Sequence, residues 1–299
     1  MNRGLLSTIR RRGVAATLAI VASLSGTVLG VTPSLAAAEP AAEPQPLIVK
    51  LAGPEGVPSD VPNGVPLPVP YGDLGPGTPL VITRPDGTWG CTANFIWRSG
   101  GTKYLGTAGH CLFPTPSRIQ ACVSGCVFGV TSGAVLSPLV DVCNLNCSFP
   151  VIANGGVGND FGLIGLANST STLRYTVPVF GGPVGSIALT AGQPVCYYGN
   201  GLGVGEVFAT KARVAIGAGA TANAWYADGA ASLGDSGAPV VKCDPHTSDA
   251  IRGSAAIGIE THGPCASVIP ARTMCGTTVA RAIGLAASSG LSISIAEGS

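Results

Sequence analysis

The stretch Gly234-Asp235-Ser236-Gly237-Ala238-Pro239 decides how this sequence is interpreted, together with two stretches upstream of it. These are Gly106-Thr107-Ala108-Gly109-His110-Cys111 and Asn159-Asp160-Phe161-Gly162-Leu163-Ile164. A serine hydroxyl is a weak nucleophile, so it needs a base within hydrogen-bond reach, and an imidazole that titrates near neutrality can serve. A carboxylate holds that imidazole in one tautomer and stabilises its charged form. We therefore predict that Ser236, His110 and Asp160 act together as a catalytic triad.

The backbone around the serine fits the same chemistry. A tetrahedral oxyanion needs backbone N–H donors, and the small residue before the nucleophile lets the backbone turn toward a substrate. Gly234 and Ser236 are the predicted donors of this oxyanion hole. Asp235 is predicted to be a buried structural acid. The competing interpretations are that each stretch is an ordinary turn, and that Asp141 replaces Asp160 as the acid.

Composition predicts an all-β chain. The 299 residues include 44 Gly and 24 Pro, which disfavour helix interiors, and only 10% are charged. Short β-rich or apolar runs bounded by turn residues predict strands at Thr92 to Trp97, Lys103 to Thr107, Phe161 to Leu166, Gln193 to Tyr198, Ala238 to Lys242 and Ala255 to Thr261. Only Thr278 to Ala287 has a helical pattern, with Val279, Ala282, Ile283 and Ala286 on one face.

The N-terminus has the pattern of an export signal. Residues 1–38 combine a basic head, an apolar run and an Ala36-Ala37-Ala38 cleavage pattern, and the alternative is an uncleaved anchor. Residues 39–80 are rich in Pro, Gly and Ala, and we expect them to be extended and outside any sheet, as a pro-segment, a linker or an arm over the folded domain. Without residues 1–38 the formal net charge is −3, which excludes a basic nucleic-acid surface and a polybasic membrane patch.

Together the three stretches resemble the chymotrypsin/trypsin family of serine proteases, and more closely its secreted bacterial members. The resemblance covers about residues 81–290. It implies two packed antiparallel β-barrels, residues 81–176 and 177–299, the second with a C-terminal helix. His110 and Asp160 would lie on the first barrel and Ser236 on the second. In animal relatives the acid equivalent to Asp235 pairs with a freed N-terminus, so an internal arginine would have to replace that partner here.

The ten cysteines, after an export signal, predict disulfides rather than a zinc site. Cys91 and Cys111 match the family bridge that holds the histidine loop, and Cys196 and Cys243 resemble another family bridge between neighbouring strands. The bridge beside the nucleophile has no partner in this sequence, so Cys265 is expected to pair with Cys275. The pairing of Cys122, Cys126, Cys143 and Cys147 stays open.

The resemblance also locates a specificity pocket. Its floor, six residues before the nucleophile, is Ala230, and its wall is Glu260, Thr261, His262 and Gly263. Thr261 replaces a family serine that supports the aspartate. An inward Glu260 would favour Lys or Arg side chains and an inward His262 acidic ones, and residues two apart share a face of a regular strand. The third interpretation is that neither lines the pocket.

The leading hypothesis is a secreted, monomeric serine endopeptidase that acts on polypeptides without a metal or cofactor. One alternative is a catalytically silent binding protein on a protease fold, because a fold alone does not guarantee activity. Another is an esterase that uses the same triad.

Overall fold

The computed structural model describes residues 44–50, 73–123, 139–201, 211–245, 251–265 and 273–298, all within one compact unit. The predicted signal 1–38, residues 39–43 and 51–72, and Cys126 lie outside these ranges. Strands dominate the described part of the chain, with one α-helix near its end, so the predicted all-β class is confirmed. No helix in the described ranges is long and apolar enough to cross a membrane.

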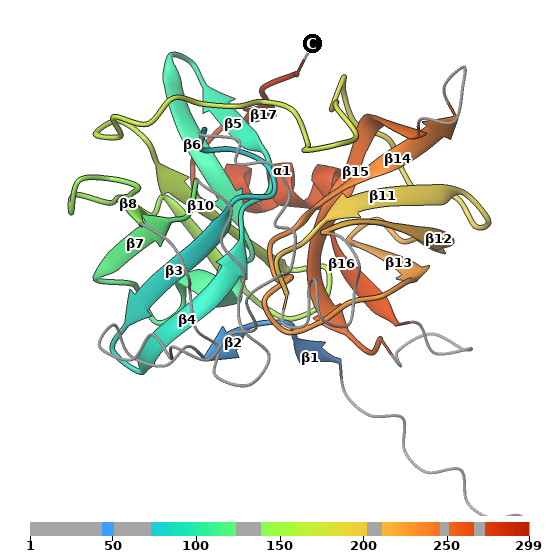
Figure 1. Cartoon of the computed structure of the whole chain (residues 1–299), viewed down its shortest axis with the longest axis horizontal. Coiled ribbons are helices and arrows are strands. Elements are labelled where there is room, and N and C mark those ends of the chain that lie inside the picture. Colours follow the sequence, from blue (N-terminus) through green and yellow to red (C-terminus); the bar gives the residue numbers. More distant parts are fainter. Residues whose placement is uncertain are drawn as a thin grey trace, which may run out of the picture. The chain divides into compact units, whose positions relative to one another are not determined.

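The N-terminal half consists of two five-stranded sheets around one core (Figure 1). One sheet contains β17, β5, β6, β10 and β9, and the other contains β2, β4, β3, β7 and β8. The bounds are β2 Val49–Lys50, β3 Pro79–Arg84, β4 Gly87–Thr92, β5 Ile96–Ser99, β6 Thr102–Thr107, β7 Arg118–Ala121, β8 Val140–Asp141, β9 Val151–Asn154, β10 Asp160–Gly165 and β17 Ser294–Ile295. Apolar side chains of both sheets share the core, among them Ile82, Ile119, Ile96 and Leu105, all fully buried.

The C-terminal half is a closed barrel. Its strands are β11 Pro194–Tyr198, β12 Ala212–Ala220, β13 Ala224–Asp228, β14 Pro239–Pro245, β15 Ile251–Gly263 and β16 Met274–Thr278. They pair in the order β15-β14-β11-β12-β13-β16, and β16 pairs back with β15. A further short strand, β1 (Gln45–Pro46), adds to the outer side of β15. Tyr197, Trp225 and Val240 fill the barrel and are fully buried.

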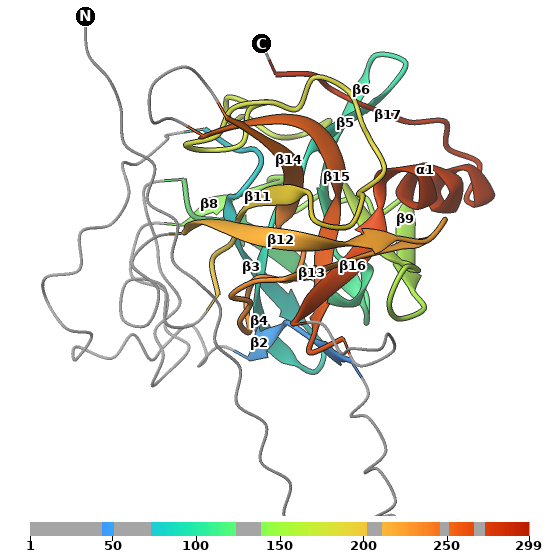
Figure 2. The ribbon, with the colours of Figure 1, turned by 90° about the vertical axis from the view of Figure 1, so that its right-hand side faces the viewer.

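The helix α1 (Val279–Ser288) forms where the sequence predicts it. The hydroxyl of Thr278 caps it by accepting the N–H of Arg281 at 3.2 Å. Its apolar face packs into a cluster that also includes Phe161 of β10 and Ile259 of β15, so the helix contacts both halves (Figure 2). After the helix, β17 returns to pair with β5 of the first half. The domain boundary at 176/177 stays a prediction.

One predicted strand, Thr92 to Trp97, is in fact interrupted at residues 93–95. Asn94 explains the break, because its Oδ1 accepts the backbone N–H of Phe95 at 2.7 Å and the indole N–H of Trp97 at 2.9 Å. An Asn side chain that satisfies nearby donors competes with the strand ladder. The other five predicted strands overlap β6, β10, β11, β14 and β15.

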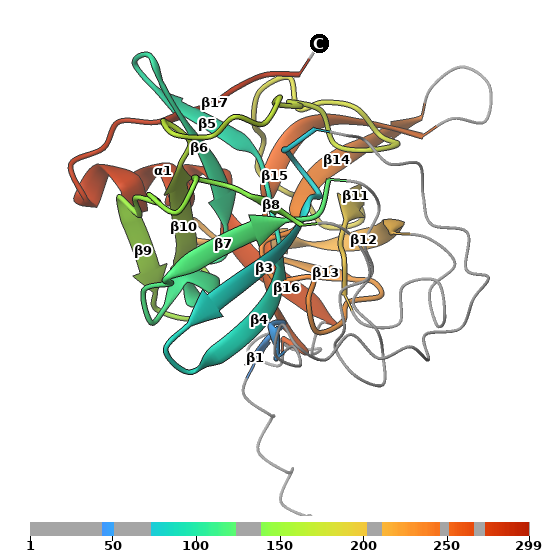
Figure 3. The ribbon, with the colours of Figure 1, turned by 60° about the vertical axis from the view of Figure 1, so that its left-hand side comes forward.

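Residues 39–80, called the proline-rich segment below, differ from the prediction that they lie outside the sheets. Within this segment β1 pairs with β15, and β2 pairs with β4. Each of these strands has two residues, and β1 lies at the edge of its sheet, where proline is tolerated. In Figure 3, β1 lies at the end of the molecule where β4 and β16 come together.

Candidate active site

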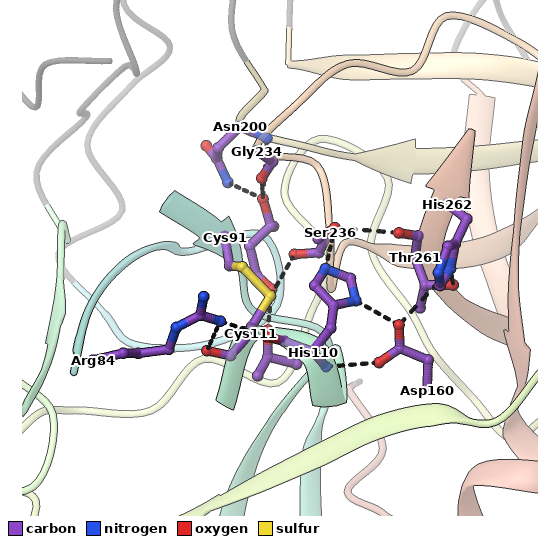
Figure 4. The surroundings of a disulfide bond; sticks show 12 residues. Arg84, Cys91, His110, Cys111, Asp160, Asn200, Gly234, Ser236, Thr261 and His262 are labelled. Carbon is purple, nitrogen blue, oxygen red and sulfur yellow. Dashed lines mark hydrogen bonds and ion pairs between the residues drawn. A yellow bond between two sulfur atoms is a disulfide. The ribbon is translucent and has the colours of Figure 1, made fainter. Parts of the chain in front are cut away.

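The backbone around His110 is held by two contacts to neighbouring strands. It lies on the 3₁₀-helix η1 (Gly109–Leu112), just after β6. The disulfide Cys91–Cys111 ties this helix to β4. Arg84 of β3 donates a hydrogen bond from Nη1 to the carbonyl oxygen of His110 at 2.6 Å (Figure 4). No sequence motif marks Arg84, so its role is visible only in the structure.

The His110 ring bridges Asp160 and Ser236. Its Nδ1 lies 2.5 Å from Asp160 Oδ2 and its Nε2 lies 2.8 Å from Ser236 Oγ (Figure 4). Asp160 is fully buried, and its Oδ1 also accepts the backbone N–H of His110 at 2.9 Å. We therefore assign the ring hydrogen to Nδ1, which leaves the Nε2 lone pair facing the serine hydroxyl. In this arrangement the imidazole can take a proton from the serine.

Asp160 is also tied across the two halves. It begins β10, and its backbone N–H donates to Thr277 Oγ1 at 3.1 Å. The hydroxyl of Thr277, on β16 of the barrel, donates back to the carbonyl oxygen of Asp160 at 2.8 Å. This reciprocal pair sets the acid of the first half against the barrel that carries Ser236.

The turn before β14 requires its glycines. Gly234 has φ 104° and Gly237 has φ 96°, which L side chains rarely adopt. A Cβ on Gly237 would lie 2.0 Å from the carbonyl oxygen of Thr92 and 2.4 Å from Thr107 Oγ1. Thr92 also fixes the turn, since its hydroxyl donates to the carbonyl oxygen of Gly234 at 2.9 Å and its N–H to that of Ser236 at 2.8 Å.

Arg213 is the arginine that pairs with Asp235. Its Nη2 lies 2.6 Å from Asp235 Oδ1, and the two side chains are 7% and 0% exposed. Asp235 also accepts the N–H of Gly201 at 2.7 Å and of Ser232 at 2.8 Å. The charge of Asp235 is therefore balanced from within the barrel, and the loop does not need a freed N-terminus for that purpose.

The backbone N–H groups of Gly234 and Ser236 donate to one acceptor, the carbonyl oxygen of Leu47. The distance from Ser236 N to that oxygen is 3.3 Å. The N–H of Leu47 in turn donates to the carbonyl oxygen of Thr261 at 3.0 Å. A residue of the proline-rich segment therefore lies in the candidate site. A leucine in such a segment belongs to no motif, so Leu47 could not be predicted as a site residue.

The predicted pocket wall is irregular. The register of β15 against β16 shifts between Glu260 and His262. The strand is therefore not regular there, and the prediction that the two side chains share one face does not apply. The two side chains have different neighbours. The carboxyl of Glu260 is influenced by Asp235 and Arg213, whereas the ring of His262 lies against the triad.

His262 is a buried neighbour of the triad. Its ring centroid is 5.6 Å from that of His110, and its Nδ1 is 3.8 Å from Asp160 Oδ2 and 2.7 Å from Thr261 Oγ1. Burial lowers the pKa of His262 to about 4, against the attraction of Asp160, so the ring is neutral at neutral pH. The hydroxyl of Thr261 lies next to His262 Nδ1, and no hydrogen bond from it to Asp160 is described.

Glu260 is fully buried, and neither carboxyl oxygen has a hydrogen-bond partner among the described residues. Burial, and then the negative charge of Asp235, raise the pKa of Glu260 well above its ordinary value, while Arg213 acts in the opposite direction. A buried carboxyl without a partner favours its neutral form. Glu260 therefore brings little negative charge to this part of the barrel.

The other two residues predicted for the pocket, Ala230 and Gly263, have different neighbours. The carbonyl oxygen of Ala230 accepts the hydroxyl of Tyr197 at 2.6 Å and Nη1 of Arg213 at 2.7 Å. A Cβ built on Gly263 would lie 2.6 Å from the carbonyl oxygen of Thr273, which is too close, and 3.6 Å from Leu47 Cδ2, which is ordinary contact. A side chain at position 263 would therefore clash with the backbone of Thr273, on the side where Leu47 also lies.

Four disulfides are described. Those expected from the resemblance, Cys91–Cys111, Cys196–Cys243 and Cys265–Cys275, are all present, and the pairing left open includes Cys143–Cys147. No cysteine in the described ranges is free.

One group of side chains in the site could also hold a metal ion. Ligand atoms of His110, Asp160 and His262 lie within 4.8 Å of one another. Both ring nitrogens of His110, however, already have hydrogen-bond partners in Asp160 and Ser236. A metal ion would have to break these hydrogen bonds, so the proton-transfer arrangement accounts for the cluster better.

The chain is similar in fold to solved structures of chymotrypsin-like serine proteases. A glutamic acid-specific serine protease is 18% identical, with 74% of this chain and 100% of the other covered and a TM-score of 0.46. Protease A of Thermobifida fusca is 20% identical over 74% and 98%, with a TM-score of 0.43. A scabies mite inactivated protease paralogue is 13% identical over 71% and 94%, with a TM-score of 0.46. No family model matches the sequence, and no curated protein matches it.

Proposed function

We propose that this chain is a secreted serine endopeptidase that hydrolyses peptide bonds of polypeptides through an acyl-enzyme. One observation carries the proposal. An unbroken hydrogen-bond chain runs from Asp160 through His110 to Ser236, and beside it two backbone N–H groups donate to the carbonyl oxygen of a peptide. The first feature makes a nucleophile, and the second stabilises the negative charge that its attack creates.

In the proposed reaction, Ser236 Oγ attacks the carbonyl carbon while His110 Nε2 takes the hydroxyl proton. Asp160 stabilises the imidazolium and keeps Nδ1–H oriented. The N–H groups of Gly234 and Ser236 hold the oxyanion, and His110 then gives its proton to the leaving amine. Water resolves the ester by the same route. Backbone pairing with β15, as Leu47 shows with Thr261, would hold an extended substrate by strand addition.

The setting of the site agrees with secretion. Disulfides persist in oxidising compartments, and every described cysteine is in one. Export through residues 1–38, action as a monomer and catalysis without metal or cofactor belong to the proposal. The alternatives of an esterase and a silent binding protein make different predictions about amide hydrolysis and serine reactivity.

The test is the intact mass of the secreted protein before and after treatment with a fluorophosphonate. We expect one adduct on the wild type and on Ser289→Ala, which removes an exposed hydroxyl at the end of α1, and none on Ser236→Ala. An adduct that persists in Ser236→Ala, or none on a folded wild type with an open site, would contradict the proposal.

A further inference from the structure

A segment of the chain itself lies across the candidate active site. On one side, β1 runs antiparallel to β15, with Pro46 opposite His262. On the other side, β2 runs antiparallel to β4, with Val49 opposite Gly90. Figure 1 shows β1 below the barrel and β2 below the first half. The peptide bond between Leu47 and Ile48 therefore passes from one half of the protein to the other.

Leu47 is held as the residue before a scissile bond should be held. Its N–H donates to the carbonyl oxygen of Thr261, and its carbonyl oxygen accepts from both Gly234 and Ser236. These two donors are the ones that the developing oxyanion needs. Two N–H groups of the turn at residues 234–237, called the nucleophile turn below, converge on a residue of the proline-rich segment. No other described contact explains this convergence.

The catalytic groups are already assembled while the segment is bound. The distance from Ser236 Oγ to His110 Nε2 is 2.8 Å, short enough for the proton transfer that the reaction begins with. The nucleophile turn also has its donors in place, because Arg213 rather than a new N-terminus balances Asp235. The uncut chain thus lacks none of the groups that the reaction uses.

The side chain of Leu47 indicates what the pocket accepts. It is 5% exposed, although it belongs to none of the three core clusters of the protein. Its immediate neighbours Pro46 and Ile48 are partly exposed. Glu260, the acidic residue expected in the pocket wall, favours its neutral form. An apolar side chain therefore fits this environment without an unpaired charge.

We infer that the Leu47–Ile48 bond is cut by this chain's own Ser236, and that polypeptides with an apolar residue before the scissile bond are its substrate class. This inference rests on the proposed function. Ser236 Oγ bonds to the carbonyl carbon of Leu47, the C–N bond to Ile48 breaks, and His110 passes the serine proton to the Ile48 nitrogen. Water then cleaves the ester, leaving a Leu47 carboxylate and a free Ile48 amine.

The two products differ in how they are held. The new N-terminus at Ile48 stays next to β2, which pairs with β4 and places Lys50 Nζ 5.8 Å from the ring centroid of Trp89. The segment that ends at Leu47 keeps the short pairing of β1 with β15 and the hydrogen bond of Leu47 to Thr261, but it loses its covalent bond to β2 and the first half. Before the cut, Leu47 blocks the site against other polypeptides. Its departure opens the site.

The experiment is to express the full chain and to determine its N-terminus by intact mass and N-terminal sequencing. We expect Ile48 as the N-terminus of the wild type and no cut at this bond in Ser236→Ala. Leu47→Asp, which puts a carboxylate in the buried position, should be cut at least ~100-fold more slowly. The matched control Ser289→Asp adds the same charge at an exposed position at the end of α1 and should be cut normally. The rate should not change on tenfold dilution, because the bond is in the same molecule.

The outcomes separate this inference from the proposed function. Leu47→Asp would bury a carboxylate without a partner, so we expect the segment to leave the pocket and the site to open without a cut. A fluorophosphonate adduct on that variant, together with an uncut wild type, would overturn the inference and leave the protease intact. A wild type cut at another bond, or a cut at Leu47–Ile48 that persists in Ser236→Ala, would also overturn it. No adduct on Leu47→Asp would sink the proposed function itself.

Discussion

Replacing Arg213 by Met should destabilise the protein strongly, because it leaves Asp235 charged and fully buried. The pair has its atoms 2.6 Å apart and side chains that are 7% and 0% exposed. Removing one partner of such a pair costs about 3–5 kcal/mol. Two backbone N–H donors remain on Asp235, so the lower part of this range is expected.

For a domain of this size, about 3–5 kcal/mol corresponds to a fall in Tm of about 6–20 °C. The matched control is Arg118→Met, which breaks an ion pair to Asp141 at 2.9 Å in which the arginine is 46% exposed. Such an exposed pair contributes about 0–1 kcal/mol. Thermal unfolding of both variants, monitored by circular dichroism, gives the comparison.

Adding Asp235→Asn to Arg213→Met removes the stranded charge and should recover part of the lost Tm. A melting temperature of Arg213→Met equal to that of Arg118→Met would refute the claim that this pair stabilises the nucleophile turn. Failure of the double variant to recover would show that lost packing, and not the buried charge, causes the effect.

Three further outcomes are expected. Because the pKa of His262 is lowered to about 4, the folded state binds a proton there only at a lower pH than the unfolded state does. The free energy of unfolding of the wild type should therefore fall by on the order of 3 kcal/mol as the pH falls from 6.5 to 4. In denaturant titrations, His262→Phe should show a smaller fall over the same range. The raised pKa of Glu260 has the opposite effect on the pH dependence of stability: the free energy of unfolding should decrease as the pH rises above 4.5. Glu260→Gln should remove this decrease, and an unchanged pH dependence in that variant would contradict a neutral carboxyl. Replacing both Cys196 and Cys243 by Ala opens a loop with a sequence separation of 47. The free energy of unfolding should fall by about 4 kcal/mol at 25 °C. A fall of less than about 1 kcal/mol, measured by denaturant titration, would disagree with the loop-entropy explanation.

Much of the site could be predicted because its chemistry depends on short motifs. His110, Asp160 and Ser236 each lie in a stretch whose neighbours have a local purpose, as Gly234 and Gly237 show by their positive φ angles. The β-rich class also followed from composition and turn residues, because alternation and punctuation are properties of the local sequence.

The rest depends on contacts between residues far apart in the sequence. Arg213 precedes Asp235 by 22 residues and has no motif, so only the barrel shows that they meet. The interruption at Asn94 arises from a side chain that takes the role of a ladder partner. The role of Leu47 requires the convergence of β1, β15 and the nucleophile turn, and a proline-rich composition hides it.

The most direct test of the central claim is hydrolysis of a peptide amide with leucine before the scissile bond, measured with the secreted protein. We predict cleavage by the wild type, a fall in kcat of roughly 10⁴-fold in Asp160→Asn, and at least as large a fall in Ser236→Ala. Equal rates in wild type and Ser236→Ala would contradict the account. So would a wild type with an open site that hydrolyses the matching ester but never the amide.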